Sequence, residues 1–203
     1  MERVAYAISV VFHPILIPIY LFLLIAEIDP VMNLFFTTSL KWRFVSSLFI
    51  TTVIGPALSM YLLKRRGLIA DLEMSQLKGR SLMFIITVLY YMLTYYMLKD
   101  LELPGVIHGM FLSLITTLIL LALVSIRYKI SAHMAALGGV SAMMFWIFVK
   151  YGIWQSNWIL GIFFLAAIVA SSRLLLQAHR PHEVGTGYLL GLCCVYATMN
   201  LVV

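Results

Sequence analysis

The densest group of polar and ionisable side chains in the second half of the chain lies between Ser171 and Gly187. His179 and Glu183 are four residues apart, so on a helix the carboxylate would accept a hydrogen bond from one imidazole nitrogen. That bond would fix the tautomer of the ring and leave the other nitrogen available as a nucleophile, a base or a ligand. Pro181 lies between the two and predicts that a helix begins there. A basic interfacial cap is the alternative interpretation.

A second polar segment, 127–133, ends with Ser131 and His133 immediately before a long apolar stretch. A hydroxyl and a histidine at the start of a helix favour anion binding, because the first backbone N–H groups have no partner within the helix. The alternative is that His133 is an interfacial residue or a cap. If the two segments share one face of the fold, they predict a site for a phosphate-like anion.

Composition predicts that membrane-spanning helices position both segments. The chain has 203 residues, of which 63% are hydrophobic and 11% charged, with a mean hydropathy of +1.03. Soluble domains carry about 25% charged residues, so this composition excludes soluble, disordered, coiled-coil and disulfide-rich classes. The adjacent Cys193 and Cys194 are interpreted as small core residues. We expect an all-α, polytopic transmembrane helical bundle with no soluble domain, in which residues 1–203 form a single integral membrane domain.

Seven stretches are free of Asp, Glu, Lys and Arg and are candidates for membrane spans. They are Val4–Ala26, Phe44–Leu63, Ser81–Leu98, Gly105–Ile126, Met134–Val149, Trp158–Ser172 and Val184–Val203. The fifth and sixth have only about 15 residues each, so we expect them to extend to His133 and Arg173 to complete a crossing. Pro14 and Pro18 predict a kink in the first.

An odd number of spans places the two termini on opposite faces of the membrane. One face, which we call the rich face, receives the N-terminus and the segments 64–80, 127–133 and 173–183. It holds ten of the fourteen Lys and Arg residues, which indicates a cytoplasmic face unless some of them bind phosphate instead. We expect a multi-pass protein of the plasma membrane, which in a bacterium is the inner membrane.

The polar segment after the sixth span resembles the third signature motif of the type-2 phosphatidic acid phosphatase family. These are integral membrane lipid phosphatases related to vanadium haloperoxidases. Their motif is Ser-Arg, five residues, His, three residues, Asp. Here Ser172 and Arg173 are followed by five residues, His179, three residues and Glu183, so that Glu replaces Asp.

The other two motifs of the family are matched in part. The second, Pro-Ser-Gly-His, is similar to the segment that contains Ser131 and His133. The first, Lys, six residues, Arg-Pro, retains its Arg at Arg80, and Lys78 would supply a nearby positive charge. The resemblance implies a motif-bearing core over residues 64–203.

The resemblance also implies the chemistry of the site. His179 would be the nucleophile that forms a phosphohistidine, Glu183 would orient it, and His133 would protonate the leaving oxygen and later activate water. Arg173, Arg80, Lys78 and Ser131 would bind the phosphate. No metal or cofactor is implied. The expected substrate is a lipid phosphate or pyrophosphate, and the expected partners are membrane lipids, with no nucleic acid.

Three other functions are compatible with the sequence. Glu73 stands where the first motif has Lys, and Ile130 and Ala132 stand where the second has Pro and Gly. These departures favour a catalytically inactive relative that binds lipid or acts as a scaffold. A haem or metal site would use the set His13, His133, His179 and His182, but the spacing is not typical of one. A transporter would need charged residues at the membrane midplane, which the spans lack. His13 itself is interpreted as a helix-packing residue, and the segment 67–79 as an amphipathic cover over the site.

Overall fold

The computed structural model describes residues 1–68 and 77–203, without the side chains of residues 77 and 78. The described residues form helices and connecting turns, with no strand. The elements in chain order are α1 (Glu2–Val11), η1 (Pro14–Leu16), α2 (Ile17–Ile28), α3 (Pro30–Phe35), α4 (Thr38–Leu48), η2 (Phe49–Ile54), α5 (Gly55–Arg65), α6 (Leu77–Leu98), α7 (Gly105–Val124), α8 (Ala132–Tyr151), α9 (Ser156–Leu175) and α10 (Pro181–Val202). Seven of the helical segments are long and apolar enough to cross a membrane, which confirms the predicted spans.

The first span is broken where the sequence predicts a kink. His13 has an extended backbone, and its Nδ1 atom accepts a hydrogen bond of 3.2 Å from the N–H of Ile15. The break occurs there because Pro14 has no N–H to continue the ladder of α1. Pro18 lies in the first turn of α2, where a proline is tolerated, and adds no second kink.

The fifth and sixth spans are longer than their uncharged stretches, as predicted. Helix α8 extends from Ala132 to Tyr151 and α9 from Ser156 to Leu175, so each has 20 residues. His133 therefore lies in the first turn of α8 and Arg173 in the last turn of α9. Both polar side chains are carried by helices that span the membrane.

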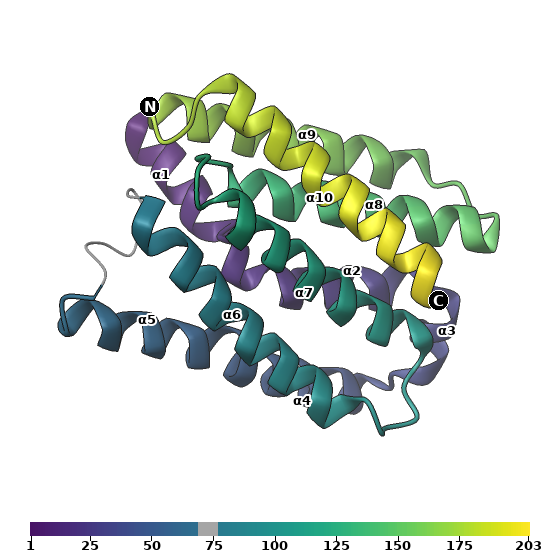
Figure 1. The fold of residues 1–203 in the computed structure, drawn as a ribbon. Coiled ribbons are helices and arrows are strands. Elements are labelled where there is room, and N and C mark those ends of the chain that lie inside the picture. Colours follow the sequence, from purple (N-terminus) through teal and green to yellow (C-terminus); the bar gives the residue numbers. More distant parts are fainter. Residues whose placement is uncertain (69–76) are drawn as a thin grey trace.

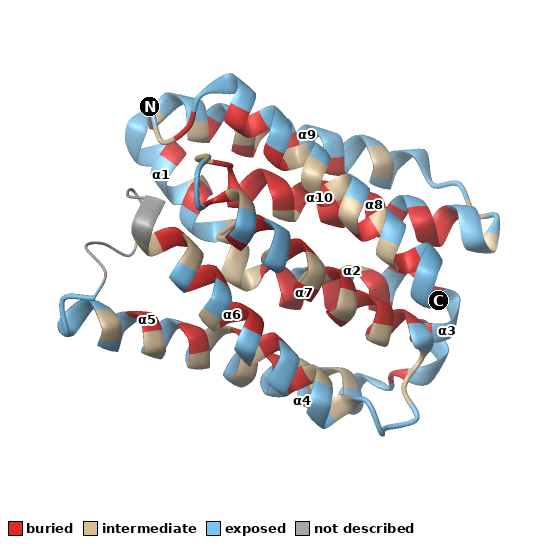
Figure 2. Cartoon of the chain, viewed as in Figure 1, coloured by how far each residue is buried: buried red, intermediate tan, exposed pale blue. Residues whose placement is uncertain are grey.

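Helix α8 lies at the centre of the bundle, where Figure 2 shows it mainly buried. It packs on α7, α9, α10 and α2. Its crossing with α10 is closest at two glycines, because a residue without a side chain lets the two backbones approach. A Cβ atom on Gly191 would lie 1.8 Å from the carbonyl oxygen of Ala135, and one on Gly138 would lie 2.0 Å from that of Tyr188.

Gly191→Ala is expected to lower the thermal unfolding temperature of the detergent-solubilised protein. The added methyl group meets backbone rather than a movable side chain, so α8 and α10 must separate, at a cost of about 1–3 kcal/mol. Gly185→Ala is the matched control on the same helix, because a Cβ there has no neighbour within 4 Å. Equal unfolding temperatures for the two variants would contradict the close crossing.

The termini lie at opposite ends of the bundle (Figure 1), as an odd number of spans requires. The N-terminus shares its end with the α7–α8 turn, the α9–α10 turn and the start of α6. The rich face is therefore one end of the bundle. It brings together segments that are more than 100 residues apart in the sequence.

Candidate functional site

The turn between α9 and α10 positions His179. Helix α9 ends at Leu175, and Gln177 adopts a left-handed backbone with φ of 50°, which reverses the chain. Helix α10 begins at Pro181, as predicted. His179 consequently lies in the turn, and the expectation that it shares a helix face with Glu183 is wrong.

The predicted pair forms nevertheless, by another route. Glu183 is the third residue of α10, and its carboxylate reaches back over the start of the helix. One oxygen, Oε2, accepts hydrogen bonds from Nδ1 of His179 at 2.9 Å and from the backbone N–H of Arg180 at 3.1 Å. The same carboxylate thus caps the helix and fixes the orientation of the imidazole. This leaves Nε2 of His179 as the nitrogen that carries the lone pair.

His179 is buried, and burial is the main cause that lowers its pKa to about 4. The hydrogen bond to Glu183 opposes this shift, while the positive charges of Arg80 and Arg173 add to it. At neutral pH the ring is therefore uncharged. A neutral imidazole whose Nδ1–H is held by a carboxylate is prepared to act as a nucleophile through Nε2.

A backbone hydrogen bond holds the segment that contains Ser131 against the start of α10. The N–H of Ser131 donates a hydrogen bond of 3.1 Å to the carbonyl of Glu183. Ser131 is the N-cap of α8 and is fully buried, yet its hydroxyl has no hydrogen-bond partner among the described residues. Buried hydroxyls are usually satisfied, and this one lies at the start of a 20-residue helix, where an anion would satisfy it.

Two arginines bring positive charge to the same region. Arg80, from the first part of α6, is buried and donates a hydrogen bond to the carbonyl of Ile130. Arg173 interacts electrostatically with both His133 and His179, and also with Arg80. The side chains of Lys78 and Glu73 lie outside what the structure describes, as does most of the proposed cover over residues 67–79.

His133 is held by the first span, which the sequence resemblance does not include. Its Nε2 atom is 3.0 Å from the carbonyl oxygen of Ser9. Its ring also meets the ring of His13 edge-on, with the centroids 5.5 Å apart. These groups line a cavity of about 270 Å³, which we call the head cavity, and its lining is Tyr6, Ser9, Val10, His13, His133, Arg173, Leu176 and Ala178.

His179 lines a neighbouring recess of about 680 Å³ together with Lys129 and Glu183. The recess and the head cavity share Ala178 as a lining residue. His133 and His179 interact electrostatically but face different hollows. Arg173 interacts electrostatically with both histidines but lines only the head cavity.

His13 is the functional candidate that sequence reasoning set aside. Pro14 was the signal in the sequence that could have identified it. A proline breaks the helix there, and the break leaves a side chain and a backbone carbonyl outside the regular hydrogen bonds of the helix. His108 contacts Tyr95 and the exposed His182 contacts Tyr128, and neither lines the head cavity or the recess. Over residues 1–68 and 77–203, no three His, Cys, Asp or Glu side chains are grouped to hold a metal ion.

The predicted residues Arg80, Ser131, His133, Arg173, His179 and Glu183 therefore come together at one end of the bundle. They combine a neutral imidazole, positive charge, an unsatisfied hydroxyl and a second histidine. Comparison of the chain with protein-family models, curated proteins and solved structures finds no match.

Proposed function

We propose that this membrane protein is a metal-independent phosphatase that hydrolyses a lipid phosphate or pyrophosphate through a phosphohistidine on His179. The observation that carries the proposal is the buried, neutral imidazole of His179, which Glu183 orients and two arginines flank. We also propose that it is a multi-pass protein of the plasma membrane.

In the first step, Nε2 of His179 attacks phosphorus as the bond from phosphorus to the lipid oxygen breaks. The electron pair of that bond stays on the lipid oxygen, which takes a proton from Nδ1 of His133 in its protonated form. In the second step, water attacks phosphorus, and the phosphorus–nitrogen bond breaks with its electron pair on Nε2 of His179. The water gives a proton to Nδ1 of His133, and phosphate is released. Since the Ser9 carbonyl accepts the Nε2–H of His133, its Nδ1 atom would exchange the proton.

The remaining groups stabilise charge, which is most of what phosphoryl transfer requires. Arg80 and Arg173, with Lys78, would neutralise the equatorial phosphate oxygens. The Ser131 hydroxyl would donate to one of them, which would satisfy its hydrogen-bonding capacity. Cationic side chains can meet this requirement without a metal.

One observation favours a second function. His133 lines the head cavity and His179 the recess, so the two histidines do not face one common hollow. A protein that binds a lipid phosphate without cleaving it would retain the arginines and Ser131 but would not need the histidines aligned.

The test is phosphate release by the detergent-purified protein in EDTA. The substrates are phosphatidate, phosphatidylglycerol phosphate, undecaprenyl pyrophosphate and a lipid A phosphate. We expect release from at least one of them. Binding without release from any of the four, by a protein whose thermal unfolding is cooperative, would support the non-catalytic function instead.

The pH dependence of kcat/KM provides a separate test, because it reports the pKa of groups in the free enzyme. Protonation of His179 removes the attacking lone pair, so activity should fall on the acid side with a midpoint near pH 4. Glu183→Gln should move this midpoint to lower pH, since the carboxylate is the group that raises the pKa of His179. A midpoint near 6.5, the ordinary value for histidine, would contradict the lowered pKa of His179.

A further inference from the structure

An apolar groove lies directly beneath the head cavity. It has a volume of about 260 Å³ and runs between the first span, α8 and α9. Its lining is Phe12, Ile17, Tyr20, Leu24, Leu137, Val140, Met144, Trp158, Gly161, Ile162 and Leu165, without a charged residue. The head cavity above it contains two histidines and an arginine.

Two neighbouring pairs of residues connect the head cavity to the groove. His13 lines the head cavity and the preceding residue, Phe12, lines the groove. On α8, His133 lines the head cavity and Leu137, one turn further along, lines the groove. A polar cavity and an apolar groove thus follow one another along a single seam of the bundle.

The groove extends away from the rich face along two helices. It extends over eight residues of α8, from Leu137 to Met144, and over eight residues of α9, from Leu165 back to Trp158. At a rise of 1.5 Å per residue, each of these distances is about 10 Å. The groove is therefore elongated along the direction in which lipid chains lie in a membrane.

The groove is open on its outer side. Gly161 is exposed, and a Cβ atom built on it has no neighbour within 4 Å. Tyr20 and Trp158, which also line the groove, are 37% and 40% exposed. Surrounding lipid can reach the groove from the side.

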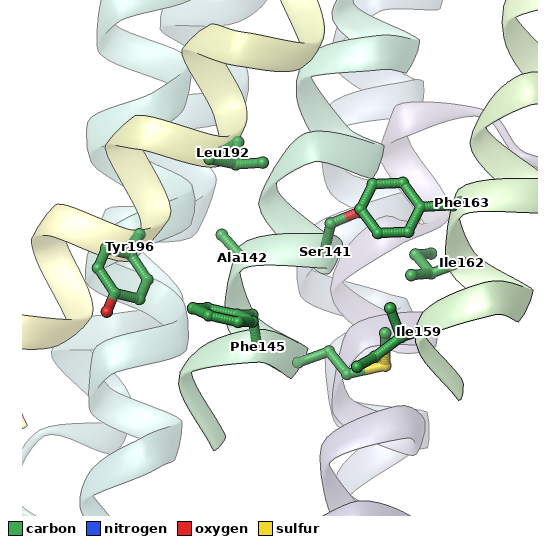
Figure 3. A pocket seen from close by; sticks show the side chains of 9 residues that line it. Ser141, Ala142, Phe145, Ile159, Ile162, Phe163, Leu192 and Tyr196 are labelled. Atoms are coloured by element: carbon green, nitrogen blue, oxygen red, sulfur yellow. The ribbon is translucent and has the colours of Figure 1, made fainter. Parts of the chain in front are cut away.

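A second apolar cavity of about 400 Å³ lies on the other side of the α8–α9 contact and is not continuous with the head cavity. Figure 3 shows Leu192 and Tyr196 of α10 on one side of it and Ile159 and Ile162 of α9 on the other. Its nearest lining residue on α8, Ser141, is eight residues from His133, or about 12 Å along the helix. A chain attached to a phosphate in the head cavity is therefore nearer to the groove than to this second cavity.

We infer that the groove between the first span, α8 and α9 binds one hydrocarbon chain of a membrane lipid whose phosphate lies in the head cavity beside Arg173. The inference rests on the proposed function and adds the place of the chain. The occupant is a lipid rather than a protein, because a cationic cavity lies next to an uncharged groove that is open on its outer side. The first span, outside the motif-bearing core, forms one wall of this site.

Gly161→Phe tests the inference, because Gly161 lines the groove and a Cβ atom added there has no neighbour within 4 Å. With alkyl phosphates from butyl to hexadecyl, the wild type should show kcat/KM that rises with chain length. The variant should lose about tenfold or more on hexadecyl phosphate and stay near wild type on butyl phosphate. Leu160→Phe is the matched control, since Leu160 is 67% exposed and does not line the groove. An unchanged chain-length dependence in Gly161→Phe would overturn the inference.

A binding measurement separates this inference from the proposed function. A hexadecyl phosphate with a photoreactive group near the end of its chain should label groove residues of α2, α8 or α9 in the wild type and not in Gly161→Phe. Labelling of the groove without phosphate release would retain the binding site and overturn the phosphatase. Phosphate release with labelling outside the groove would retain the phosphatase and overturn the binding site. Loss of labelling in excess inorganic phosphate would show that the head cavity binds the phosphate group without needing the hydrocarbon chain.

Discussion

His179→Ala should reduce phosphate release by at least about 10⁴-fold while the protein stays folded. In the proposed mechanism the side chain supplies the attacking nitrogen, and no other imidazole among the described residues is hydrogen-bonded to Glu183. The measurement is release from the best lipid substrate, with size-exclusion profiles and unfolding temperatures of the two proteins compared. A residual rate within tenfold of wild type would remove His179 from the reaction.

The covalent intermediate can be detected directly. Wild type quenched during turnover of a ³²P-labelled lipid should carry a label that is stable in alkali and lost in acid, as expected for phosphohistidine. The label should be absent from His179→Ala. His182→Ala is the matched control in the same polar segment, because the His182 side chain is exposed and its ring contacts the ring of Tyr128. This variant should keep both the label and the rate of phosphate release.

His133→Ala should reduce release from an alkyl phosphate by about 10²–10⁴-fold, the range typical of a lost general acid. The loss should be much smaller in the first turnover of nitrophenyl phosphate, whose leaving group is stable without a proton. The comparison uses the burst of nitrophenolate, since His133 would still be needed for hydrolysis of the phosphohistidine in later turnovers.

This dependence on the leaving group distinguishes chemistry from folding. A variant that merely distorted the head cavity would lose activity equally on both substrates. His108→Ala is the control for histidine removal, because His108 begins α7 at the other end of the bundle and contacts Tyr95. Equal losses on the two substrates would assign His133 to phosphate binding or to structure.

The spans could be predicted from the sequence because each depends on a local property, an uncharged stretch of about 20 residues. The extension of α8 to His133 and of α9 to Arg173 followed from length alone. The pairing of His179 with Glu183 was predicted from their spacing on a helix. In the structure no helix contains both residues, because His179 lies in the turn before α10. The turn achieves the same contact because Glu183 reaches back as the third residue of α10.

The role of the first span could not be predicted, because it depends on tertiary packing. Nothing in the spacing from Ser9 or His13 to His133, more than 100 residues apart, indicates that they meet. The division of the two motif histidines between two hollows is also a property of packing. Motif order places both at the rich face but does not specify which hollow each one lines.

The crossing of α8 and α10 determines where the protein can open. At Gly138 and Gly191 the two helices are in direct backbone contact, so neither can move there without displacing the other. The other side of α8 has no such contact and contains the groove, bounded by the broken first span and by α9, which is mostly exposed. Any breathing motion that lets a lipid exchange with the bilayer would therefore displace α9 or the first span, while the α8–α10 pair remains a fixed frame.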